Sequence, residues 1–145
     1  MRHHLFLEIV SALLAMVFIY AAISKLIDFN NFSLQLNQSP FIYPFAGWVV
    51  WIIPAGETFT VFLLLIKKLR LYGLFASLFI MSLFTAYLIA MLNFSDYLPC
   101  SCGGLLEMLS WKAHIVFNSF LLLLSSAGIG IYTQSIQKIY QHSRL

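Results

Sequence analysis

The chain has 145 residues, of which 61% are hydrophobic and 9% are charged, and its formal net charge is +3. A soluble domain carries roughly 25% charged residues, so this composition excludes an ordinary soluble domain and indicates one integral membrane domain over residues 1–145. The few Lys and Arg residues form no basic polar surface. This argues against a nucleic-acid partner and favours a role in membrane topology.

Four apolar runs of about 20 residues follow one another, each long enough to cross a hydrocarbon core of about 30 Å. The first run, residues 5–27, is too long for the apolar part of a signal peptide and ends without a small-residue cleavage site, so we expect a retained anchor. The others cover residues 46–66, 71–93 and 112–133. We interpret residues 28–44 as a loop and Lys67–Arg70 as a short turn that makes a hairpin of the second and third spans.

The distribution of Lys and Arg predicts the orientation of this all-α, four-helix membrane bundle. Four spans place both termini on one side. The basic residues on that side are Arg2, Lys67, Lys68, Arg70, Lys138 and Arg144, against Lys25 and Lys112 on the other. Because cytoplasmic loops are enriched in basic residues, we expect cytoplasmic termini in a bacterial inner membrane. The loop over residues 94–111 then faces the periplasm.

That loop holds the two cysteines of the chain, Cys100 and Cys102, followed by Gly103 and Gly104. A disulfide between cysteines one residue apart closes a very tight ring, and strained disulfides are easily reduced. The glycines supply the backbone freedom that such a turn needs, and a helix that starts soon afterwards stabilises thiolates. In an oxidising compartment these features favour a redox pair over two inert thiols or a passive bridge.

His114 lies in the first turn of the fourth span, Asn118 one turn further on the same face, and Trp111 on the loop side. Histidine titrates near neutral pH, so His114 is a candidate to exchange protons with a thiol or a quinol. The alternative is an interfacial histidine that is hydrogen-bonded to its neighbours. His114 and the cysteines would supply only three ligands at an unusual spacing, so we predict no metal site.

Glu57 lies about midway through the second span, where a carboxylate is costly unless it is paired or protonated. Lys25 is the nearest cation in the outward half, and its side chain is long enough to reach inward. The two residues differ in depth by about two turns, so a direct pair stays open, and a purely structural Glu57 is the alternative. We also expect a pocket in the outward half of the bundle. Its candidate lining residues are Tyr20, Ser24, Trp51, Thr85 and Tyr87.

Three stretches together resemble the MauE branch of the DoxX-like membrane proteins, which are small four-helix proteins named from methylamine utilisation. The stretches are Tyr20–Asp28, Pro54–Glu57 and Cys100–Gly104, the last with its downstream Trp111, His114 and Asn118. The resemblance implies a role in disulfide formation or thiol redox chemistry, with a periplasmic thioredoxin-like protein or a disulfide-containing client as partner. The wider DoxX relatives are associated with quinone-linked chemistry, which implies a membrane quinone as a candidate cofactor.

Two functional hypotheses result. In the first, the chain is a thiol–disulfide oxidoreductase in which Cys100 and Cys102 exchange electrons with an exported protein and His114 handles the proton. In the second, it is a non-enzymatic accessory or assembly subunit of a larger membrane complex, and the cysteine loop is a docking surface or a local staple. A small transporter is less well supported, because only Glu57 lies deep in a span and we find no internal repeat of the transporter type.

Overall fold

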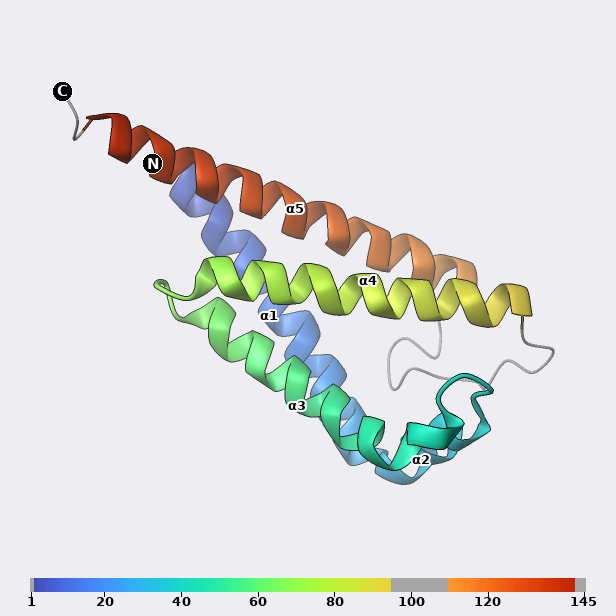
Figure 1. Ribbon diagram of the computed structural model, residues 1–145. Coiled ribbons are helices and arrows are strands. Elements are labelled where there is room, and N and C mark those ends of the chain that lie inside the picture. Colours follow the sequence, from blue (N-terminus) through green and yellow to red (C-terminus); the bar gives the residue numbers. More distant parts are fainter. Residues whose placement is uncertain (1, 95–109, 143–145) are drawn as a thin grey trace.

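The computed structural model describes residues 2–94 and 110–142, and these residues form an assembly of helices (Figure 1). Four helices are long and apolar enough to cross a membrane. They are α1 (Arg2–Ile27), α3 (Ala46–Leu65), α4 (Arg70–Phe94) and α5 (Trp111–His142). The expected all-α fold with four spans is therefore confirmed. Cys100 and Cys102 lie outside the described residues.

The prediction of a loop over residues 28–44 was wrong, because this segment contains two short helices. They are α2 (Phe29–Gln38) and the 3-10 helix η1 (Tyr43–Phe45). The many Asn, Ser and Gln residues hide a helical pattern, in which Phe29, Phe32 and Leu36 recur at the spacing of one helix face. Leu36 is buried and packs with the first residues of α3, so α2 is held across one end of the bundle.

The core of the bundle lies where its four long helices meet. α1 packs against α3 and α5, and α4 packs against the same two helices, which closes the arrangement. Leu14, Phe18, Leu64, Leu74 and Leu121 are fully buried at this junction. Gly73 lets α4 approach α3 closely, because a Cβ atom at this position would lie 2.7 Å from the backbone nitrogen of Leu64. Small residues at helix contacts are typical of membrane bundles.

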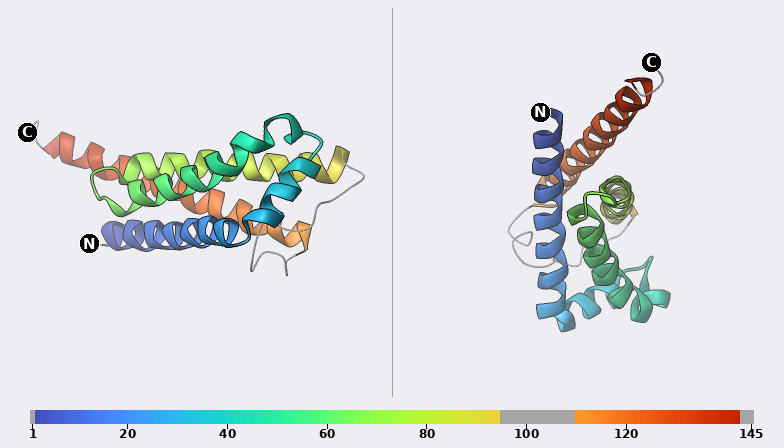
Figure 2. Two further views of the ribbon diagram at one scale, coloured as in Figure 1. Left: turned by 90° about the horizontal axis from the view of Figure 1, so that it is seen from below. Right: turned by 90° about the vertical axis from the view of Figure 1, so that its left-hand side faces the viewer.

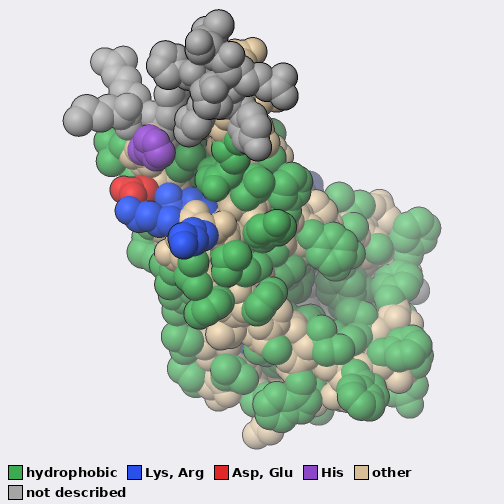
Figure 3. All heavy atoms as spheres, turned by 60° about the vertical axis from the view of Figure 1, so that its left-hand side comes forward, with side chains coloured by type: hydrophobic (Ala, Val, Ile, Leu, Met, Phe, Trp, Pro, Cys, Tyr) green, Lys and Arg blue, Asp and Glu red, His purple; other side chains and the backbone are tan. Residues whose placement is uncertain are grey.

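The two ends of the bundle differ. The start of α1 and the end of α5 lie at one end, and α2 with η1 lies at the other (Figures 1 and 2). At the first end, Lys67 Nζ in the turn between α3 and α4 lies 3.5 Å from Glu8 Oε1 in α1. Figure 3 shows Lys, Arg, acidic and His side chains gathered in one area, with hydrophobic side chains over most of the rest of that face.

Candidate functional site

A buried ion pair joins α1 to α3. Lys25 Nζ, near the end of α1, lies 2.8 Å from Glu57 Oε1 in the middle of α3, and the two side chains are 5% and 1% exposed. Lys25 also donates a hydrogen bond to the Ala21 carbonyl oxygen at 3.2 Å. The long Lys side chain spans the difference in depth between the two residues. Because an isolated charge is very costly in this environment, each residue makes the burial of the other tolerable.

The pair retains unused hydrogen-bonding capacity. Glu57 Oε2 is buried and has no hydrogen-bond partner in the described part of the chain. An ammonium group has three donors, and two of those on Lys25 are engaged by Glu57 and Ala21. A salt bridge that served only to lock helices together would gain from satisfying these remaining atoms.

The position of His114 is set by the way in which α5 begins. Ser110 caps the helix: its Oγ accepts a hydrogen bond from the Ala113 amide at 3.3 Å, and its carbonyl oxygen accepts one from the His114 amide at 3.0 Å. His114 is therefore fixed in the first turn of α5, where its side chain is buried. The charge of Lys25 acts on the imidazole. We use the name polar cluster for the ion-paired Lys25 and Glu57 together with His114, which lies within electrostatic range of Lys25.

Asn118 extends the same face of α5, one turn beyond His114, and it is also buried. An amide at this position adds a donor and an acceptor one helical turn from His114. Trp111 starts α5, but its side chain lies outside the described part of the structure, as do the two cysteines. Within residues 2–94 and 110–142, no three His, Cys, Asp or Glu side chains are grouped so that they could hold a metal ion.

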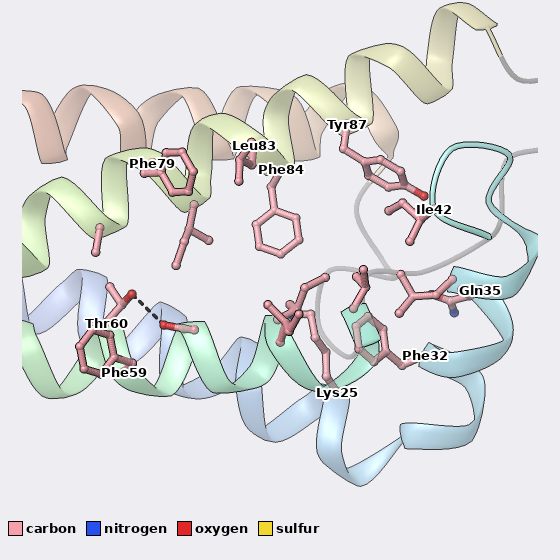
Figure 4. A pocket seen from close by; sticks show the side chains of 17 residues that line it. Lys25, Phe32, Gln35, Ile42, Phe59, Thr60, Phe79, Leu83, Phe84 and Tyr87 are labelled. Atoms are coloured by element: carbon pink, nitrogen blue, oxygen red, sulfur yellow. Dashed lines mark hydrogen bonds between the residues drawn. The ribbon is translucent and has the colours of Figure 1, made fainter. Parts of the chain in front are cut away.

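A pocket of about 520 Å³ opens between α2, α3 and α4 (Figure 4). Its wall is mainly apolar and aromatic, and its polar lining residues are Lys25, Gln35, Thr60 and Tyr87. Gly56 on α3 and Ala76 on α4 lie in the wall, and these two small side chains leave space between the helices. They are the sequence signal from which the position of the pocket could have been inferred.

Of the residues expected from the sequence to line a pocket, one lines this pocket and the others lie elsewhere in the bundle. Tyr87 lines it, and its hydroxyl donates a hydrogen bond to Ser39 Oγ at 3.0 Å, which ties α4 to the segment after α2. Thr85 is buried and donates to the Met81 carbonyl oxygen within α4. The others lie away from the pocket wall: Tyr20 and Trp51, both exposed, and Ser24, which is half-buried. Lys25 is the residue common to the pocket and the polar cluster.

These features define a class of protein: a small multi-pass membrane protein with a buried polar cluster beside an apolar pocket in its helical bundle. The chain belongs to the MauE family, because the family model described as methylamine utilisation protein MauE matches residues 3–133. No curated protein and no solved structure matches the chain. The match confirms the resemblance seen in the sequence and identifies a membrane protein of a family linked to methylamine utilisation.

Proposed function

We propose that this protein is a membrane thiol–disulfide redox protein that assists disulfide formation in exported proteins, or electron transfer to them, through Cys100 and Cys102. The observation that carries the proposal is the position of His114. This buried imidazole belongs to the polar cluster and lies one helical turn after Ser110, close in sequence to the cysteine segment. A histidine titrates near neutral pH and is suited to taking up and releasing protons.

The proposed reaction is thiol–disulfide exchange. A client thiolate attacks one sulfur of the Cys100–Cys102 disulfide, whose S–S bond breaks as a mixed disulfide forms. The second client thiolate then attacks the mixed disulfide, so the client leaves oxidised and both cysteines are left as thiols. Two electrons and two protons have moved from client to protein, and His114 handles the protons. A membrane quinone is the proposed oxidant that restores the disulfide, becoming a quinol as it accepts two electrons and two protons.

The proposed orientation places the termini in the cytoplasm and the cysteines in the periplasm, across a bacterial inner membrane. The balance of basic residues between the two ends supports it. Lys25 counts little toward the outward side, because it is buried in the ion pair rather than placed at the membrane surface. The partner would be a periplasmic thioredoxin-like protein or a disulfide-containing client. Membrane-impermeant thiol labelling of intact cells, before and after reductant, tests the orientation and the resting redox state together.

The test of the function is to trap the mixed disulfide. In a Cys100→Ser or Cys102→Ser chain, the remaining thiolate can attack a disulfide of an oxidised exported protein, which is the reverse of the proposed exchange. The neighbouring thiol that would resolve the mixed disulfide is then absent, so disulfide-linked adducts should accumulate. Ser101→Ala is the matched control, because it alters the same tripeptide and keeps both thiols. A His114→Gln chain should still form adducts, but exchange should be slower by about tenfold to a hundredfold if proton transfer is lost.

The proposal fails if neither Ser variant traps an exported protein and client oxidation is unchanged in both. A stoichiometric complex that survives mild detergent and the loss of both cysteines would instead support the accessory-subunit hypothesis. The comparison with Ser101→Ala separates the chemistry of the thiols from a purely structural effect of changing the loop.

A further inference from the structure

The pocket between α2, α3 and α4 has its mouth on the lipid-facing surface of the bundle. Ile52 and Phe59 on α3, and Phe79 and Leu83 on α4, line the pocket, and each is more than half exposed. These residues lie within the membrane-spanning helices. Figure 4 shows Phe59, Phe79 and Leu83 around the same space. A ligand that enters by this route comes from the hydrocarbon phase and has a largely apolar body.

One lining residue of the pocket is a buried, charged hydrogen-bond donor, Lys25. Lys25 Nζ lies 5.5 Å from the ring centroid of Phe84 and 5.9 Å from that of Phe32, and both rings line the pocket. Two of its three donors are used by Glu57 and Ala21. The third has no hydrogen-bond partner in the described part of the chain and is next to the pocket wall. A ligand with an acceptor oxygen would satisfy it.

The charge balance at Lys25 selects the kind of acceptor. The carboxylate of Glu57, 2.8 Å from Lys25 Nζ, already balances the ammonium charge. An anionic head group would therefore bring an unbalanced negative charge into a buried site, which is costly. A neutral carbonyl oxygen accepts the third hydrogen bond without that cost. The flanking Phe32 and Phe84 rings favour a flat ring by aromatic stacking.

From the lipid-facing mouth, the apolar wall and the charged donor close to two aromatic rings, we propose that this pocket binds the head ring of a membrane quinone, with Lys25 donating to one carbonyl oxygen. The cavity of about 520 Å³ lies within the range of small-molecule sites. The inference rests on the proposed function, because thiol oxidation needs a two-electron acceptor such as a quinone. Binding of the quinone can nevertheless be measured without any thiol reaction.

The experiment uses the full chain with Cys100→Ser and Cys102→Ser, reconstituted in phosphatidylcholine nanodiscs. A photoreactive azido-quinone with a short alkyl tail is the probe, decylubiquinone is the competitor, and labelled peptides are mapped by mass spectrometry. We expect saturable labelling of α3 and α4. Ala76→Phe fills the wall of the pocket and should weaken labelling by at least about tenfold, a loss of about 1.4 kcal/mol.

Ala86→Phe is the matched control for the pocket-filling variant. It makes the same change on the same helix at an exposed position that does not line the pocket, so labelling should be unchanged. The second variant, Lys25→Met with Glu57→Met, removes the donor without leaving an unpaired buried charge. It should keep its helical content and lose about tenfold in affinity, the scale of one hydrogen bond from a charged donor.

The inference is overturned if labelling is unsaturable, if it maps away from α3 and α4, or if Ala76→Phe and Ala86→Phe behave alike. It is also overturned if an alkyl ester of the same tail length competes as well as decylubiquinone, since the pocket would then be a site for lipid ester carbonyls. Quinone binding without trapped mixed disulfides supports the pocket and removes the proposed function. Trapped mixed disulfides without quinone labelling would support the proposed function and overturn the quinone site.

Discussion

The ion pair between Lys25 and Glu57 gives the most quantitative prediction. At the observed Nζ–Oε1 distance of 2.8 Å, an effective dielectric constant of about 20 gives a direct attraction of about 6 kcal/mol. Desolvation offsets much of this attraction in the intact pair. Lys25→Met removes the attraction but leaves Glu57 buried, so we expect a loss of about 3–5 kcal/mol in the free energy of unfolding.

The double variant Lys25→Met with Glu57→Met should behave differently from either single variant. It replaces both buried charges with apolar side chains, and such replacements are often neutral or stabilising. We therefore expect a coupling free energy of at least about 2 kcal/mol between the two positions. Reversible unfolding in mixed micelles of mild detergent and dodecyl sulfate, followed by far-ultraviolet circular dichroism, measures all four proteins of the cycle. Additive effects, with coupling below about 0.5 kcal/mol, would refute the reasoning.

Two further predictions concern the packing of α3 on α4 and the hydrogen bond between Tyr87 and Ser39. Gly73→Ala should lower the free energy of unfolding by about 1–3 kcal/mol, because the new Cβ would lie 2.7 Å from the Leu64 nitrogen. Gly130→Ala is the control. A Cβ atom at that position would have no neighbour within 4 Å, so the substitution should not lower the free energy of unfolding. Equal effects of the two substitutions would contradict the close approach of α3 and α4. Tyr87→Phe should cost about 0.5–1.5 kcal/mol through its lost bond to the buried Ser39 hydroxyl; no change in the same unfolding assay would show that this bond does not hold the segment after α2.

The spans could be predicted because few backbone structures can cross a membrane. A run of about 20 apolar residues must satisfy its backbone internally as a helix, so the four long helices follow from hydropathy alone. The short helix α2 could not be found in the same way. Its apolar residues Phe29, Phe32 and Leu36 are separated by Asn, Ser and Gln, which are common in loops. Its stability comes from packing on the start of α3, a tertiary contact that no local pattern contains.

In the candidate site, too, the residues could be predicted from the sequence but their contacts could not. Glu57 and Lys25 could be named from the sequence, because ionisable residues within spans are rare and costly. Their direct contact depends on how α1 and α3 pack and on the reach of a flexible side chain. The pocket depends on three helices at once, since its wall combines Phe32 of α2, Gly56 of α3 and Ala76 of α4. Gly56 and Ala76 mark where two helices could leave space, but neither residue shows which helices face each other, and this is a property of the packed bundle.

Lys25 connects the two parts of the molecule that carry our proposals. It lines the pocket, forms the ion pair with Glu57, and its charge acts on His114. A carbonyl ligand that accepts the third N–H of Lys25 would therefore be one residue away from Glu57, whose carboxylate contacts the same ammonium group. If a quinone were reduced there, it would take up two protons with its two electrons, and the Glu57 carboxylate in contact with Lys25 would be the nearest group of the polar cluster to supply them. Ala76→Phe alters the pocket and leaves the ion pair in place, whereas the Met pair removes the charges and leaves the walls in place. Comparison of the two therefore separates the contribution of the apolar walls to binding from that of the charged donor.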